Sequence, residues 1–409
     1  MEINWSKADS FIGNFTSPAL VYNRPCPICD SIRSKIVFQL SDFQFFSDST
    51  TLPKRVNIVE HQCMDCFALF LNPCYSSYGF QVLFAEAGQS YGATEGRPIE
   101  QAKWLDSRGL LCEGKTILDA GCYDGDFLSN LPNRVKKVGV DIDRPAIERG
   151  TRKYAQQEIE FVLGDFESFK YPDQIDTITM FHVLEHLPRP VKVLRNLRTN
   201  ASSSTHLVLE VPILENGITN DINGFFSVQH MTHFSRNSLR NSLARAGWRV
   251  IEWIEQEGYN GCRVLAVPDL ETSSVEGDSN DITSLYRYLS AWYQTTSLVS
   301  ARLAKLQRSK RCIIWGAGAH TEFLYHVTPF FLANPQHEYA IVDSDLLKHN
   351  KSWRGLKIYG TEALREVDWS DTNLLISSYG SQDAIIKVAL ERGVPNDKIA
   401  WMYDEVRVY

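Results

Sequence analysis

The chain has 409 residues, of which 44% are hydrophobic and 22% charged, and its formal net charge is −7. This length exceeds what one hydrophobic core normally serves, so two or three globular domains are expected. The negative charge argues against broad binding to nucleic acid or to an anionic membrane. The sequence shows no apolar run long enough to span a bilayer, and MEINWSKADSF lacks the features of a secretory signal, so a cytoplasmic protein is expected.

Two close cysteine pairs stand near the N-terminus, Cys26-x-x-Cys29 and Cys63-x-x-Cys66. The spacing lets both sulfurs of each pair reach one ion, and four thiolates complete a closed tetrahedral zinc site with a structural role. The alternatives are four buried thiols or a redox pair. Two further side chains could replace a ligand, namely His61 and Cys74. The intervening segment contains a strand-like stretch over 36–46 that could form a hairpin arm.

From about residue 100 the pattern alternates between strands and helices, which predicts an α/β doubly wound domain with a parallel sheet. The expected strands lie in TILDA, KKVGVD, IEFVL, IDTITMF and THLVLEV, and Pro145 favours the start of a helix after the second strand. Ligands of such sheets bind beyond the carboxyl ends of the strands. The residues at those ends are therefore the candidates for ligand binding.

Acidic residues follow three successive strands: Asp119 precedes a two-glycine turn at Gly121 and Gly125, and Asp141 and Asp165 end the next two strands. The glycines let backbone approach a ligand closely, and an acid after the second strand suits a ribose diol. Asp124 in the turn would repel a pyrophosphate, so a nucleoside with a cationic group is favoured. Another bound nucleotide is the alternative.

These features resemble the class I S-adenosylmethionine-dependent methyltransferases. The resemblance covers LDAGCYDG, the acids after the second and third strands, and FHVLEHLPRP after the fourth. It implies S-adenosylmethionine as cofactor, bound by Asp119, Gly121, Tyr123, Gly125, Asp141, Ile142, Asp165, Phe166 and His182. Glu185 and His186 follow the fourth strand and are candidates for cofactor binding, structure or catalysis.

The whole chain is similar to the tri-domain sugar C-methyltransferases, whose motif after the fifth strand runs approximately Tyr-Glu-His-x-x-Tyr-Phe-Ser. The corresponding residues here read VQHMTHFS over 228–235, so the histidine, phenylalanine and serine match. A later glycine and arginine of the family appear here as Gly261 and Arg263. The resemblance implies a small-molecule acceptor that is a nucleotide-linked keto-deoxysugar.

His230 is the candidate general base, because removal of a proton beside a ketone creates the carbon nucleophile that attacks the donor methyl group. His233 could assist, and Gln229 replaces the glutamate of the family motif and so cannot raise the basicity of His230 by charge. Tyr91 could close over the substrate. O- or N-methylation of another acceptor is the alternative, and a non-catalytic binding protein that kept the fold is a second one.

The C-terminal part begins with a polar connection and a helix expected over 285–306. A strand, a turn with Gly316 and Gly318, and a helix follow, which predicts a second Rossmann-like unit. It would hold the sugar nucleotide or be purely architectural. The predicted division is 1–80 for the zinc domain, 81–270 for the methyltransferase domain and 271–409 for the Rossmann-like domain.

Overall fold

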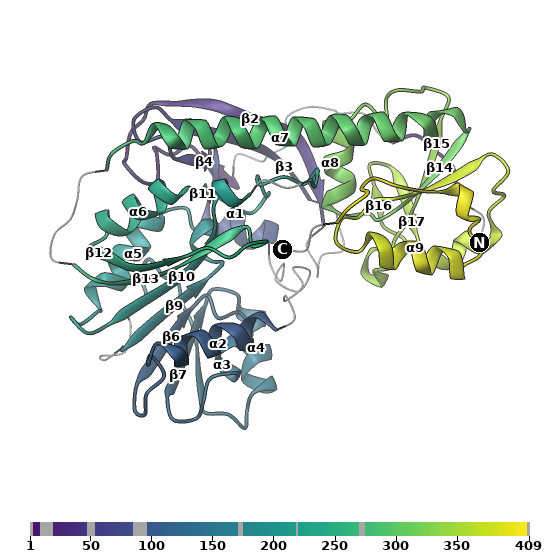
Figure 1. The fold of residues 1–409 in the computed structure, drawn as a ribbon. Helices are drawn as coiled ribbons and strands as arrows, with labels where there is room; N and C mark the ends of the chain where they lie inside the picture. The colour runs from purple at the N-terminus through teal and green to yellow at the C-terminus, as the bar shows by residue number, and fades with distance from the viewer. Residues whose placement is uncertain are drawn as a thin grey trace.

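The structure is a computed structural model, and it describes residues 3–8, 19–46, 54–84, 96–170, 175–217, 220–269 and 275–406. Two α/β bodies lie side by side, joined by a long hairpin from the N-terminal part and by a long helix that runs across both (Figure 1). Within the described residues, no helix combines the length and apolar character needed to cross a membrane.

The N-terminal part is built on the hairpin of β2 (Ser34–Phe45) and β3 (Lys54–Cys63), so the strand predicted over 36–46 is present. Strand β4 (Leu69–Leu71) extends this sheet, and β11 (Thr232–His233) completes it from far along the chain. Smaller elements are β1 (Val21–Tyr22), β5 (Cys74–Tyr75) and α1 (Ser77–Phe84). The pairing of β11 with β4 ties the cysteine-bearing part to the central body.

The central body is a seven-stranded sheet in the order β12-β13-β10-β9-β6-β7-β8. Its strands are β6 (Thr116–Ala120), β7 (Lys136–Asp141), β8 (Ile159–Leu163), β9 (Thr177–Phe181), β10 (His206–Pro212), β12 (Trp248–Ile254) and β13 (Gly261–Pro268). The five strands from β8 to β10 are parallel, as expected, whereas β13 runs antiparallel to both neighbours. Strand order reverses at β6, which is where doubly wound sheets bind ligands.

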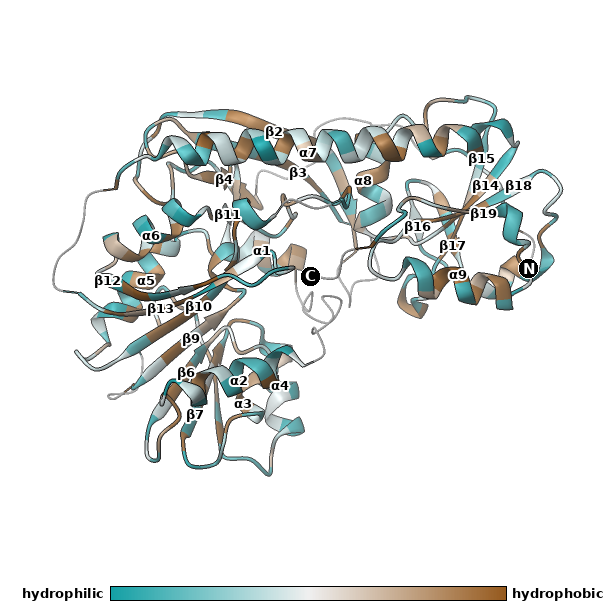
Figure 2. Ribbon diagram, viewed as in Figure 1, coloured by the Kyte–Doolittle hydropathy of each residue, from teal (hydrophilic) through white to brown (hydrophobic). Residues whose placement is uncertain are grey.

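The central helices are α2 (Arg97–Ser107), α3 (Asp126–Ser129), α4 (Arg144–Lys153), α5 (Pro190–Thr199) and α6 (Arg236–Arg245). Local sequence explains their ends. Asp143 caps α4 with Pro145 in its first turn, and Ser235 forms a capping box with Ser238 at the start of α6. The strands at the centre of the sheet are apolar, while the helices expose hydrophilic faces (Figure 2).

The C-terminal body follows α7 (Ser279–Leu303) and has a six-stranded sheet in the order β16-β17-β15-β14-β18-β19. Its elements are β14 (Arg311–Trp315), α8 (Ala319–Val327), β15 (Glu338–Val342), β16 (Ser352–Trp353), β17 (Leu356–Tyr359), β18 (Thr372–Ile376), α9 (Gln382–Glu391) and β19 (Ile399–Trp401). Asp343, just after β15, accepts a hydrogen bond from Ala317 N at 2.7 Å and so braces the glycine turn. The expected second Rossmann-like unit is present.

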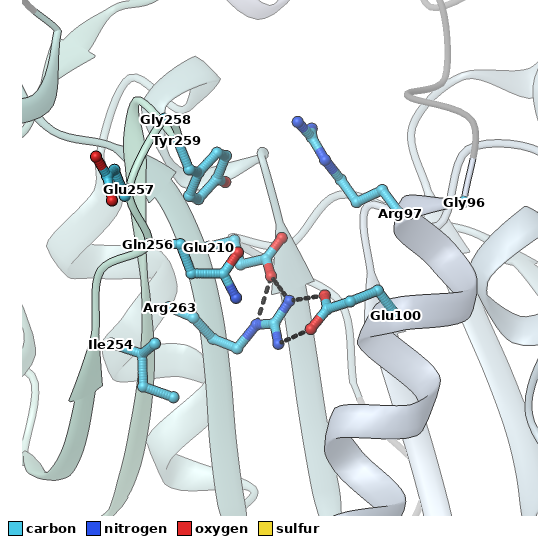
Figure 3. Close-up of a pocket in the computed structure, with 10 residues that line it drawn as sticks. All are labelled: Gly96, Arg97, Glu100, Glu210, Ile254, Gln256, Glu257, Gly258, Tyr259 and Arg263. Atoms are coloured by element: carbon cyan, nitrogen blue, oxygen red, sulfur yellow. Dashed lines mark hydrogen bonds and ion pairs between the residues drawn. The ribbon is translucent and has the colours of Figure 1, made fainter. Parts of the chain in front are cut away.

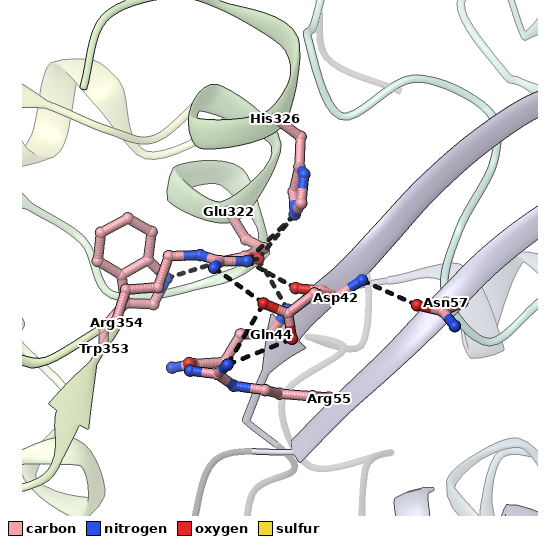
Figure 4. Close-up of polar contacts among 8 residues, drawn as sticks. All are labelled: Asp42, Gln44, Arg55, Asn57, Glu322, His326, Trp353 and Arg354. Atoms are coloured by element: carbon pink, nitrogen blue, oxygen red, sulfur yellow. Dashed lines mark hydrogen bonds and ion pairs between the residues drawn. The ribbon is translucent and has the colours of Figure 1, made fainter. Parts of the chain in front are cut away.

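A buried polar cluster joins the N-terminal hairpin to the C-terminal body (Figure 4). The Arg354 guanidinium lies between Asp42 of β2, at 3.2 Å, and Glu322 of α8, and all three side chains are fully buried. Glu322 also accepts hydrogen bonds from Gln44 N at 2.8 Å and from Trp353 Nε1 at 2.9 Å. The hairpin therefore contacts both α/β bodies, and the domain limits after residues 80 and 270 stay predictions.

Candidate functional site

The turn after β6 requires its glycines. Gly121 has φ of 92°, and a Cβ there would lie 2.2 Å from Val183 Cγ2; Gly125 has φ of 88°, and its Cβ would meet Phe161 at 2.5 Å. Tyr123, between them, also has positive φ, and its N–H donates to Asp141 Oδ2 at 2.8 Å. The turn is thus packed against the loop after β9 and held to the end of β7.

Two carboxylates lie side by side at this carboxyl edge of the sheet. Asp141 is the last residue of β7 and accepts from Asp143 N at 2.8 Å, and burial raises its pKa to about 6. Asp119 accepts from Thr179 Oγ1 at 2.7 Å, and burial raises its pKa to about 7. The remaining lone pairs of Asp141 can accept hydrogen bonds from the two hydroxyls of a ribose.

The residues expected around an adenine differ in exposure. Ile142 exposes 37% of its surface beside the end of β7, so its side chain is available to a ring system. Asp165 is exposed, and its Oδ1 accepts from Glu167 N at 2.9 Å. Phe166 is only 5% exposed and belongs to the hydrophobic core. The Phe166 ring therefore anchors this loop to the hydrophobic core and offers little exposed surface to a ligand.

His182 follows β9 with φ of 55°, and its backbone N–H donates to Glu210 O at 2.8 Å. Its Nε2 lies 2.6 Å from Tyr259 Oη, and its Nδ1 lies 3.4 Å from Glu185 Oε1. Burial would raise the pKa of Glu185, but hydrogen bonding to His182 is the largest of the opposing effects, and together they lower this pKa. An ionised Glu185 therefore faces the ring of His182.

The candidate base His230 is close to His186, with ring centroids 4.8 Å apart. One carboxylate oxygen of Glu185 and one ring nitrogen each of His186 and His230 all lie within 4.8 Å of one another. Burial lowers the pKa of both histidines, well below the usual value in His230, so both rings are neutral at pH 7. His230 Nδ1 is buried without a hydrogen-bond partner among the described residues. A neutral imidazole can accept a proton.

The other candidate catalytic residues are placed differently. His233 is 1% exposed and its Nε2 lies 2.9 Å from Glu60 Oε1 of β3, so it faces the N-terminal sheet. Gln229 is 7% exposed, and its backbone oxygen lies 3.2 Å from His186 Nδ1. Tyr91 falls outside the residues that the structure describes.

A cavity of about 300 Å³ opens at Tyr259, between the start of α2, the end of β10 and the β12–β13 hairpin (Figure 3). Arg263 bridges two carboxylates there: its Nε donates to Glu210 Oε1 at 2.5 Å and its Nη1 to Glu100 Oε1 at 3.0 Å. The Arg97 guanidinium lies 5.4 Å from the centre of the Tyr259 ring. Of this pocket, sequence reasoning identified only Arg263; Glu210 and Tyr259 belong to no local pattern.

The four paired cysteines meet in one place. Cys26 Sγ lies 3.6 Å from Cys66 Sγ, and Cys29 Sγ lies 3.5 Å from Cys63 Sγ. A tetrahedral zinc with Zn–S bonds of about 2.3 Å separates its sulfurs by about 3.8 Å, so the donor set fits zinc. His61 bonds to Ser34 through Nδ1 at 2.9 Å, and Cys74 donates to Met231 Sδ at 3.1 Å, outside this cluster.

Comparison with known proteins identifies the central part. Residues 100–252 match a family model described as a methyltransferase domain. The ubiquinone biosynthesis O-methyltransferase of Acinetobacter baumannii is 29% identical over 126 residues, which is 28% of this chain and 53% of that protein. The cypemycin N-terminal methyltransferase of Streptomyces is 28% identical over 99 residues, 23% of this chain and 40% of that protein. The chain thus spans about half the length of the curated relatives it matches.

Solved structures are similar to less than half of the chain. An S-adenosylmethionine-dependent methyltransferase from Clostridium acetobutylicum has a TM-score of 0.38 at 8% identity and covers 47% of this chain and 97% of its own. Magnesium protoporphyrin IX methyltransferase from Synechocystis with bound S-adenosylmethionine has a TM-score of 0.34 at 18% identity, covering 42% and 78%.

Proposed function

We propose that this chain, whose residues 100–252 form an S-adenosylmethionine-dependent methyltransferase domain, methylates a nucleotide-linked keto-deoxysugar, and does so on carbon. S-adenosylmethionine supplies an electrophilic methyl group on a sulfonium. The observation that carries the assignment of the donor is the turn Gly121–Gly125 braced by Asp141 at the reversal of strand order, within the matched family region. Asp119, Tyr123, Ile142 and the Asp165–Phe166 loop would complete the donor site.

His230 is the general base of this proposal, and His186 is its neighbour. Burial keeps both rings neutral, and the neighbouring histidines add to the lowering of the His230 pKa. The lowered pKa leaves the His230 ring neutral at pH 7, which is the protonation state that a general base needs before it takes a proton. Gln229 contributes its backbone oxygen to the orientation of His186.

The proposed class of acceptor rests on the resemblance of the whole chain to the tri-domain sugar C-methyltransferases and on the polar cavity of Figure 3. Carboxylates and arginine at its wall can bind the hydroxyl groups of a sugar, because these groups both donate and accept hydrogen bonds. The second candidate is O-methylation, which Gln229 and the O-methyltransferase relatives favour. The two differ in whether a C–H bond must break.

We also propose that Cys26, Cys29, Cys63 and Cys66 hold one structural zinc ion. The four sulfurs leave no open position for water, and the cluster lies in the N-terminal part. The ion would stabilise the two knuckles, and with them the sheet that β11 completes. It would take no part in methyl transfer.

The test combines a product assay with an exchange assay. The purified chain is incubated with methyl-labelled S-adenosylmethionine and thymidine- or uridine-diphosphate 4-keto-6-deoxysugars, and products are analysed by mass spectrometry. A labelled sugar supports the proposal, and loss of ring deuterium to water without donor supports carbon transfer. His230→Ala should abolish exchange, whereas His206→Ala, at the amino end of β10, should not. Label on oxygen without exchange would select O-methylation.

A further inference from the structure

Tyr259 and His182 form a short contact at the wall of the cavity in Figure 3, with Tyr259 Oη 2.6 Å from His182 Nε2. The tyrosine comes from the β12–β13 hairpin and the histidine from the end of β9. Val183, the next residue, packs against the Gly121 turn. The pair therefore lies between the expected donor site and the cavity.

Two carboxylates lie near the ring nitrogens of His182. Glu185 Oε1 is 3.4 Å from Nδ1, and Glu210 Oε2 is 3.9 Å from Nε2. When Nε2 carries the ring hydrogen, it donates that hydrogen to the Tyr259 oxygen. The Tyr259 O–H is then free to donate into the cavity, because a phenol oxygen can accept one hydrogen bond while it donates another.

The tyrosine keeps its proton in this setting. Burial, followed by the charge of Glu210, raises the pKa of Tyr259 well above its usual value, while the Arg97 guanidinium acts in the opposite direction. A neutral phenol that is held in place by a histidine is a preorganised hydrogen-bond donor.

Resting on the function proposed above, we propose that Tyr259 donates a hydrogen bond to the acceptor carbonyl oxygen where negative charge develops, and that His182 positions it. Tyr259 touches the acceptor and is catalytic in this sense, whereas His182 and Glu185 act through it. His230 lies at the other end of the same group of side chains, next to His186 and Glu185.

The step balances with these two groups. His230 takes the proton from the carbon beside the carbonyl, the C–H electron pair forms a carbon–carbon double bond, and the carbonyl π pair moves to oxygen, where Tyr259 O–H donates to it. When that pair returns, the carbon attacks the methyl group and the C–S bonding pair stays on sulfur. Tyr259 keeps its proton throughout, and the proton on His230 leaves to solvent.

The experiment compares Tyr259→Phe, His182→Gln and the double variant with the unaltered chain, using the donor and the keto sugar nucleotide that the product assay selects. Loss of one such donor typically costs about 10²- to 10³-fold in rate, so Tyr259→Phe should lower kcat and deuterium exchange about 100-fold, with KM changed less than about threefold. His182→Gln should lower both less, and should add nothing in the Tyr259→Phe background. Tyr293→Phe, at an exposed position on α7, is the matched control.

The melting temperature reports whether each variant is folded and should match the unaltered chain, and Tyr259→Phe should also keep the affinity for S-adenosylhomocysteine. Tyr259→Phe with full exchange and full turnover overturns the role of Tyr259. Additive losses in the double variant overturn the positioning role of His182. Methyl transfer to oxygen without exchange by the unaltered chain, or no methyl transfer at all, refutes the carbon-transfer function and this role with it.

Discussion

His233 of β11 and Glu60 of β3 are both fully buried, and His233 Nε2 lies 2.9 Å from Glu60 Oε1. The two residues lie 173 positions apart in the chain, and they join the segment that carries His230 to the cysteine-bearing sheet. The rings of Phe225 and Phe226 pack on His233 with centroids 5.3 and 5.1 Å away. This pair therefore positions the candidate base without reaching the cavity.

Removal of one partner should destabilise the fold. His233→Ala leaves the Glu60 side chain buried without its polar neighbour, and a buried polar group left unpaired costs about 1–3 kcal/mol. Urea unfolding should show this loss, and the double variant His233→Gln with Glu60→Gln should recover part of it. If His233 assists catalysis directly, this double variant would lose turnover far beyond its loss of folded protein; we expect turnover to follow the folded fraction.

Asp141→Asn should weaken the binding of S-adenosylhomocysteine about 10- to 100-fold, because hydrogen bonds from hydroxyls to a charged acceptor are worth about 1.5–3 kcal/mol. Titration calorimetry measures this directly. Asp343→Asn removes the acid in the corresponding place of the C-terminal body, where it braces Ala317, and it should leave the affinity unchanged. Equal losses in the two variants would place the nucleoside elsewhere.

The stability of the chain without donor should depend on pH through Asp119. Its pKa of about 7 in the folded state lies above the value of about 3.9 in an unfolded chain. The folded state therefore binds more protons between pH 4 and 7, and stability falls as pH rises through this window. Asp119→Asn should gain stability relative to the unaltered chain across that window, by up to a few kcal/mol above pH 7. A difference that stays constant from pH 4 to 8, measured by urea unfolding, would contradict this.

The sequence was sufficient for features that depend on neighbouring residues. Apolar runs located the strands, and Gly121, Gly125 and Asp141 could be assigned to one sheet edge because parallel strands end there together. Contacts between distant segments could not be predicted in this way. The pairing of β11 with β4, the antiparallel β13 and the Tyr259–His182 contact depend on tertiary packing, which leaves no periodic pattern in either segment.

Cys63→Ser should lower the zinc content from one ion per chain to a small fraction, and should lower the melting temperature, because structural zinc contributes directly to folding. Elemental analysis and thermal unfolding measure both. Folded variant protein should still bind S-adenosylhomocysteine, because the four cysteines are not among the residues of the proposed donor site. Cys312→Ser, a buried cysteine of β14 outside the cluster, is the matched control and should keep its zinc. If elemental analysis finds no zinc in the unaltered chain, the four cysteines are free thiols and the zinc proposal is wrong.

The Arg354 cluster predicts that the attachment of the C-terminal body depends on one side chain (Figure 4). Arg354→Met keeps most of the side-chain volume but leaves Asp42 and Glu322 buried without their shared cation, although Arg55 still lies 3.3 Å from Asp42. The expected cost is about 3–5 kcal/mol. Because the cluster joins β2 to α8 and lies outside the donor site, the variant should expose the connection between the bodies to protease while the central domain still binds S-adenosylhomocysteine.

Arg287→Met, on the exposed side of α7, is the control and should resist protease like the unaltered chain. Equal resistance of Arg354→Met would mean that apolar packing alone holds the two bodies together.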